Sequence, residues 1–155
     1  MTTWREESAR RLPLYTQQAQ NATDFMSLCL VLATEVRQLY HNANIIGTQI
    51  MHNEADEARL RQIYDFANWC LVDSGEPLLE GNIDFAFFRS LGTHLNIYIT
   101  QEFYRFVSRA ALRKLQTAET LAYLVGSNNE AAFVADYEKR INEQYQGSKT
   151  RSKRN

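Results

Sequence analysis

Residues 23–40 read TDFMSLCLVLATEVRQLY, and this stretch decides the fold class. Its apolar residues recur at steps of three and four, which places them on one face of a helix. These residues are Phe25, Leu28, Leu32, Val36 and Leu39. Thr23 or Asp24 offers an N-cap oxygen, and we expect Asn42 or Asn44 to mark the end of the helix.

Helical spacing continues on both sides of this stretch. We expect a short helix over Trp4–Leu12, ended by Pro13 because proline lacks the N–H that helical bonding needs. A second long helix is expected from about Asn53 to Val72, where Asn53 and Asp56 resemble a capping box. Its apolar stripe is Leu60, Ile63, Tyr64, Ala67, Cys70 and Leu71.

Glycine and proline indicate the boundaries that follow. We expect Gly75 to stop the second long helix and residues 76–81 to form a connector. An aromatic helix then opens at Asn82 or Asp84. Gly92 is expected to kink or end it, because glycine costs about 1 kcal/mol against alanine inside a helix.

The last third of the chain is also helical in its spacing. Residues 95–115 predict a helix, and a short strand over residues 97–100 is the alternative, from the β propensity of that segment. Thr117 or Thr120 is expected to cap a short helix ending at Val125. A last helix follows from Ser127, with Glu130 as its capping-box partner. Its buried stripe is Phe133, Val134, Tyr137 and Ile141.

The composition is that of one globular domain. The chain has 155 residues, of which 45% are apolar and 23% charged, a size and balance that support a core without staples. Six glycines and two prolines are too few for a turn-rich β sandwich. We therefore expect an all-α, single compact domain of five to seven helices over residues 1–146.

The C-terminal segment 147–155 differs in composition from the rest of the chain. It has no apolar side chain, so we expect it to be disordered. Four of the 17 basic residues lie in it. The remaining 13, set against 18 acidic residues, leave residues 1–146 with a net charge of −5, although the whole chain carries only −1. The near-neutral total thus combines an acidic domain with a basic tail.

The sequence predicts a cytoplasmic protein with reduced thiols. The start of the chain is acidic and lacks the apolar core of an export signal. Its longest apolar run, residues 28–33, is far shorter than the ~20 residues of a membrane span. Cys29 and Cys70 lie in apolar segments. Two buried thiols are therefore favoured over the alternative of one disulfide.

No pattern of catalytic, cofactor-binding or metal-binding residues emerges. His41, His52 and His94 are the only histidines, and no two share the spacing of ligands on one helix face. The carboxylates after His52 are explained by the helix start, where the dipole favours them. The glycines are isolated, so no phosphate-binding loop or nucleophile elbow is present. We expect a protein that is not an enzyme, with no cofactor and no metal.

The middle of the chain resembles a class of bacterial proteins. IYDFANWCL at residues 63–71, followed by NIDFAFF at residues 82–88, is similar to small all-helical proteins of the immunity and antitoxin type. In these, an Ile-Tyr…Trp helix is followed by a loop and a Phe-rich helix. The resemblance covers residues 60–125 and implies neutralisation of a toxin; it carries over no functional residue.

We therefore expect a protein-binding protein, with a cognate toxin as the implied partner. Contacts are expected in two polar and aromatic segments, 54–61 and 76–89. The candidate residues are Glu54, Asp56, Glu57, Arg61, Glu76, Glu80, Asp84, Phe85, Phe87 and Arg89. Exposed aromatic side chains among polar ones are typical of interfaces, so either Phe85 or Phe87 would have to lie at the surface.

Two alternatives of other classes remain open. The first is an enzyme or small-ligand binder with a pocket between helices, which convergent polar side chains would favour. The second is a nucleic-acid-binding regulator that uses the basic tail. This second alternative is disfavoured because the tail has no aromatic residue for base stacking. A homo-oligomer is compatible with all three functions, and no membrane association is expected.

Overall fold

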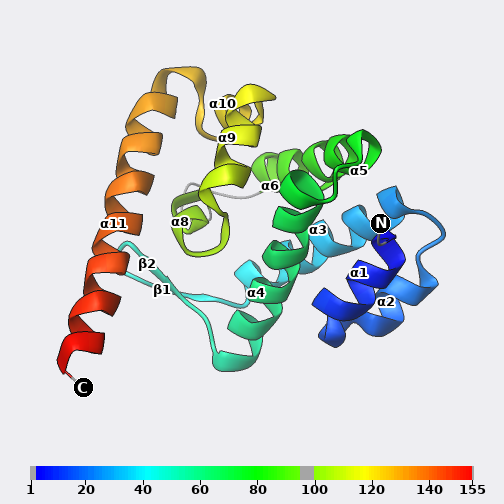
Figure 1. Ribbon diagram of the computed structural model, residues 1–155, viewed down its shortest axis with the longest axis horizontal. Helices are drawn as coiled ribbons and strands as arrows, with labels where there is room; N and C mark the ends of the chain where they lie inside the picture. Colours follow the sequence, from blue (N-terminus) through cyan, green and yellow to red (C-terminus); the bar gives the residue numbers. More distant parts are fainter. Residues whose placement is uncertain (1–2, 95–99, 155) are drawn as a thin grey trace.

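The computed structural model describes the backbone of residues 3–94 and 100–154 and the side chains of residues 3–92 and 100–144. Figure 1 shows helices packed around a central rod, with a small hairpin below and a long helix along one side. The elements are α1 (Trp4–Arg11), η1 (Pro13–Tyr15, 3-10), α2 (Thr16–Asn21), α3 (Phe25–His41), β1 (Asn44–Ile46), β2 (Gln49–Met51), α4 (Glu54–Asn68), η2 (Trp69–Asp73, π), α5 (Pro77–Asn82), η3 (Ile83–Phe88, π), α6 (Arg89–His94), α8 (Phe103–Phe106), α9 (Arg109–Thr117), α10 (Thr120–Val125), η4 (Ser127–Asn129, 3-10) and α11 (Glu130–Arg154). The all-α class is confirmed, with more helices than the expected five to seven.

Helix α3 forms as its spacing predicts. The Asp24 carboxylate caps it by accepting a hydrogen bond from the Ser27 N–H at 2.8 Å. All five residues of the predicted stripe are buried. They face η3 and α6 on one side and α4 on the other. Burying one whole face of a helix against its neighbours is what stabilises it, because propensity alone contributes little.

The central rod consists of α4 and η2, from Glu54 to Asp73. The Asn53 side chain accepts a hydrogen bond from the Asp56 N–H at 2.8 Å, which confirms the predicted N-cap. The rod ends before Gly75, whose φ of +67° suits glycine at a helix stop. Its last turn is π-helical, a form that the apolar spacing did not indicate.

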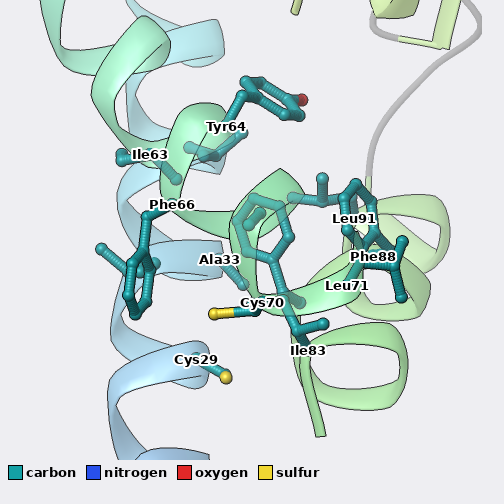
Figure 2. Close-up of a cluster of buried hydrophobic side chains, with 14 of the residues drawn as sticks. Cys29, Ala33, Ile63, Tyr64, Phe66, Cys70, Leu71, Ile83, Phe88 and Leu91 are labelled. Carbon is teal, nitrogen blue, oxygen red and sulfur yellow. The ribbon is translucent and has the colours of Figure 1, made fainter. Parts of the chain in front are cut away.

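The core is organised around two aromatic side chains of α4. Phe66 contacts Phe25 and Trp69 with ring centroids 6.3 and 6.1 Å apart. Tyr64 contacts the rings of Phe87, Phe103 and Phe106 at 5.2–6.2 Å. Figure 2 shows Tyr64 and Phe66 pointing to different sides of the rod, with Ile83, Phe88 and Leu91 packed below Tyr64. Phe66 thus joins α3 to one side of the rod, and Tyr64 joins η3 and α8 to the other.

Both cysteines are free and buried, as the sequence predicts. They belong to the apolar cluster of Figure 2, Cys29 on α3 and Cys70 on η2. Burial raises the pKa of the Cys29 thiol to about 12 and that of Cys70 still further. Because the thiolate is the nucleophile, neither group is reactive in the folded protein.

Residues 76–81 do not form the connector that the sequence predicts. Pro77 stands at the first position of α5, where its missing N–H is no loss, and the helix runs on through η3 into α6. Gly92 neither ends nor visibly breaks α6, which continues to His94. A Cβ atom at Gly92 would lie 2.2 Å from Leu124 Cδ2, so this glycine allows α6 and α10 to pack closely.

The helix expected over residues 95–115 is interrupted. Helix α8 ends at Phe106, and Ser108 caps α9 by accepting from the Ala111 N–H at 3.2 Å. Distant side chains hold the break: Asn68 Nδ2 donates to the Phe106 carbonyl at 2.9 Å, and the Tyr137 hydroxyl to the Val107 carbonyl at 2.5 Å. Residues 97–99, part of the alternative strand, lie outside the described residues.

A hairpin that the sequence analysis did not predict connects α3 to α4. Strands β1 and β2 pair antiparallel, with Ile45 opposite Ile50, around a turn in which Gly47 has a φ of +65°. Ile45, Ile46 and Met51 are exposed, and Ile50 packs partly against the core. The turn signal of a glycine between short apolar runs was present, but each strand is only three residues long.

The C-terminal helix α11 buries Tyr137, with Phe133, Val134 and Ile141 packed against the core. Its backbone is helical to Arg154, into the segment for which the sequence predicts disorder. The side chains beyond Gln144 lie outside the described residues, so the disordered tail and the boundary at residue 147 stay predictions. Among the described residues, no helix combines the length and apolar character that crossing a membrane requires.

Two glycine variants test the close packing of α6. A Cβ atom added at Gly81 in α5 would have no other atom within 4 Å. We therefore expect Gly81→Ala to raise the free energy of unfolding by about 0.5–1 kcal/mol. Gly92→Ala gains the same helix propensity but displaces Leu124. We expect it to be about 1–3 kcal/mol less stable than Gly81→Ala. Urea unfolding measures both. Equal stabilisation by the two variants would contradict close packing at Gly92.

Candidate functional site

The exposed face of α5 and η3 carries two of the three most exposed large apolar side chains among the described residues, the third being Ile46 on the hairpin. Leu78 is 72% and Phe85 64% exposed, whereas Phe87 and Phe88 are fully buried. Residues two apart on a helix point to roughly opposite sides, so Phe85 and Phe87 separate between surface and core. The inclusion of Phe87 among the partner-binding candidates is therefore wrong, because a fully buried ring cannot contact a partner.

Polar candidates come from the same segment of the chain as these two side chains. Glu76 and Glu80 are partly exposed, and the Glu80 carboxylate lies 3.8 Å from Lys114 Nζ. Asp84 accepts a hydrogen bond from the Thr120 hydroxyl, and its carboxylate lies 3.8 Å from Arg89 Nε. We call Glu76, Leu78, Glu80, Asp84 and Phe85 the α5–η3 surface.

Arg89 has a bracing role within the fold. It donates from Nη2 to the Ala118 carbonyl at 3.0 Å and from Nε to the Thr120 hydroxyl at 3.2 Å. These bonds join the start of α6 to the segment between α9 and α10. Arg89 is about a third exposed, so it stands at the rim of the α5–η3 surface rather than within it.

The first predicted segment, residues 54–61, is not part of this surface. It forms the start of α4, at the end of the rod away from α5 (Figure 1). Twelve helical residues, 62–73, lie between the two, a length of roughly 15–20 Å. Asp56 is occupied by the Asn53 cap and by Arg59 at 3.1 Å, and Glu54 and Arg61 are exposed. The structure thus divides the predicted candidates between two ends of the molecule.

A polar pocket, which sequence reasoning missed, lies at the α4 start. Its cavity is about 280 Å³ and opens between the hairpin, α4, α8 and α11. The lining residues are Thr48, Gln49, Ile50, Met51, His52, Glu57, Gln101, Glu102, Tyr104, Arg105 and Arg140. Glu57 is the one predicted candidate found here.

A chain of charged side chains forms the floor of the pocket. His52 Nε2 lies 2.7 Å from Glu102 Oε1, and Arg105 Nη1 donates to Glu102 Oε2 at 2.6 Å. Arg105 also donates from Nη2 to Glu57 Oε1. His52 and Glu102 are buried, with 1% and 8% of their side chains exposed, so the network lies in a region of low dielectric constant. Removing one partner there would leave a buried charge unpaired, which costs stability.

The network fixes the charge of its central arginine. Burial alone would lower the pKa of Arg105, but the hydrogen bonds and charges of Glu102 and Glu57 raise it above the ordinary value. Burial also raises the pKa of Tyr40 and Tyr64, and the nearby Glu102 carboxylate adds to both shifts. Arg105 therefore stays charged and both phenols stay protonated in the folded protein.

A buried nitrogen beside the floor lacks a hydrogen bond. Within the described part of the chain, His52 Nδ1 has no partner. The Tyr40 hydroxyl, by contrast, interacts with the Tyr64 hydroxyl and with Glu102. Tyr40 also contacts the His52 ring edge-on, with centroids 5.1 Å apart. An unpaired buried group costs about 1–3 kcal/mol, so a water or ligand that bonds His52 Nδ1 would be favoured.

The arrangement does not form a metal centre. Among the described side chains, no three His, Cys, Asp or Glu residues come together. His41 is exposed at the end of α3, and the side chain of His94 lies outside the described residues. The pocket was missed because its members, at positions 52, 57, 102, 105 and 140, look like ordinary helix-surface charges. The Glu102–Arg105 spacing of three was the one available signal.

Comparison with known proteins adds no relative. No protein-family model, curated protein or solved structure matches the chain. The proposed function therefore rests on the α5–η3 surface itself.

The floor of the pocket can be tested by stability. Glu102→Gln leaves Arg105 and His52 without a buried carboxylate, so we expect a loss of about 2–4 kcal/mol in the free energy of unfolding. Glu138→Gln is the matched control, since its pair with Arg109 is solvent-exposed and contributes little to stability. Urea unfolding at neutral pH measures both. Equal effects would show that the buried network is not a tightly paired unit.

Proposed function

We propose that this chain is a non-enzymatic, cytoplasmic protein-binding protein, most concretely an immunity-type inhibitor that neutralises a bacterial toxin. The observation that carries the proposal is the exposure of Leu78 and Phe85 on the α5–η3 surface. Large apolar side chains with polar neighbours are typical of recognition surfaces.

The exposure of Phe85 is not explained by a shortage of core space. The same helical segment buries Ile83, Ala86, Phe87 and Phe88 completely or almost completely. Phe85 therefore adds little to the folded state, whereas an aromatic anchor can dominate the energy of an interface. Leu78 lies on the same exposed face and adds a second apolar side chain that a partner could contact.

Charge favours a basic partner. Residues 1–146 carry −5, and Glu76, Glu80 and Asp84 lie on the α5–η3 surface itself. The net negative charge of residues 1–146 would attract the positive surface of an enzyme that acts on nucleic acid. It would also speed the capture of that enzyme by electrostatic steering.

Co-expression with the product of the neighbouring gene tests the proposal. We expect the wild-type chain to form a stable complex with that product and to rescue cells from its toxicity. Phe85→Ser should weaken the complex by about 2 kcal/mol or more, as loss of an aromatic anchor does. Leu14→Ser, which replaces an apolar side chain that is 51% exposed elsewhere on the surface, is the matched control.

Three outcomes count against the proposal. These are no complex with the wild-type chain, equal weakening by both variants, and an unchanged complex in Phe85→Ser. Circular dichroism of the purified variants shows that each is folded. Deletion of residues 148–155 tests the nucleic-acid alternative separately, since only that function requires the basic tail.

A further inference from the structure

The polar pocket has features of a binding site that the protein-binding role does not use. It lies at the opposite end of the rod from the α5–η3 surface, and its floor consists of buried charged side chains. A cavity of about 280 Å³ is just below the range of drug-sized pockets, which indicates a smaller occupant.

The floor of the pocket is negative. Glu57 and Glu102 together carry two negative charges against the single positive charge of Arg105. Both oxygens of Glu102 are engaged, one by His52 and one by Arg105. Glu57 is a third exposed, and its Oε2 lies 4.0 Å from Arg61, too far for a hydrogen bond. Glu57 Oε2 is therefore the oxygen best placed to accept a hydrogen bond from a cationic ligand group.

A second guanidinium, that of Arg140, belongs to the pocket lining. Arg140 reaches the pocket from α11, with its guanidinium 5.2 Å from the centre of the Tyr104 ring. It pairs with Asp136 through Nε at 2.8 Å, and about half of each side chain is exposed. An exposed pair one helical turn apart is worth little, so a ligand can compete for this guanidinium. A planar guanidinium binds a carboxylate through two parallel hydrogen bonds.

We propose that the pocket binds a small zwitterion of the α-amino acid class. The ammonium group lies at Glu57, and the carboxylate lies at Arg140. A carboxylate and a guanidinium that line one small cavity select a ligand that carries both charges over one that carries either alone. The proposal is independent of the protein-binding function, because it uses none of the α5–η3 surface.

The hairpin and the unpaired His52 nitrogen fit this site. Residues 48–51 cover the pocket, yet the two strands are three residues each, and such a hairpin is barely stable alone. His52 directly follows the hairpin, and its buried Nδ1 has no hydrogen-bond partner among the described residues. A ligand, with the water that enters beside it, would supply polar partners and hold the hairpin against α8.

Calorimetry with the full chain tests the proposal. Each common amino acid is titrated singly at about 10 mM, a concentration that detects millimolar binding. Acetate and methylammonium serve as single-charge probes. We expect at least one amino acid to bind and both single-charge probes to bind at least about tenfold more weakly. Arg140→Gln should weaken amino acid binding by about tenfold or more, while Arg113→Gln, an exposed arginine on α9, should leave it unchanged.

The experiment distinguishes a loss of ligand binding from a loss of the folded structure. The Arg140 side chain is 41% exposed and its ion pair lies within α11, so its variant should unfold close to the wild-type temperature. Three results would overturn the proposal: no amino acid binds the wild-type chain, acetate binds as tightly as the best amino acid, or Arg140→Gln binds like the wild type. None of these bears on the toxin complex, so the two proposals fail separately.

Discussion

The packing of aromatic rings on both sides of α4 is the constraint on which the rest of the structure depends. Phe66 faces Phe25 and Trp69, and Tyr64 faces Phe87, Phe103 and Phe106. Aromatic side chains bury the largest apolar areas, and edge-to-face pairs add about 0.5–1.5 kcal/mol each. One helix therefore holds the N-terminal helices to one side and α8 to the other.

This central rod also separates the two functional regions. At its far end the chain turns into α5 and η3, where the core is complete and Phe85 is left at the surface. At its start the aromatic packing gives way to His52, Glu57, Glu102 and Arg105, which pair with one another beside a cavity. Both regions are thus consequences of where the apolar core ends, and each is built on rigid helices.

The sequence predicts the regular helices well because the spacing of apolar residues within each helix shows which face packs against the core. The buried faces of α3 and α4, the Asp24 and Asn53 caps and the free cysteines all follow from spacing and composition. The break at Val107–Ser108 does not, because Asn68 and Tyr137 hold it from elements about 30 to 40 residues away. The pocket was missed for the same reason, since its charges meet only after α8 and α11 fold onto α4. Phe85 and Phe87 could be placed on opposite faces from sequence, but which one is buried depends on the position of α3.

Two phenylalanines, two positions apart, divide between the core and the exposed surface that we propose binds a partner. Paired urea unfolding of Phe85→Ala and Phe87→Ala tests it most directly. Phe87 is fully buried against Tyr64 and Phe88, so its truncation should cost about 3–5 kcal/mol. Phe85→Ala should change the free energy of unfolding by less than about 0.5 kcal/mol. A loss at Phe85 as large as that at Phe87 would show that both rings serve the core, and would contradict the account.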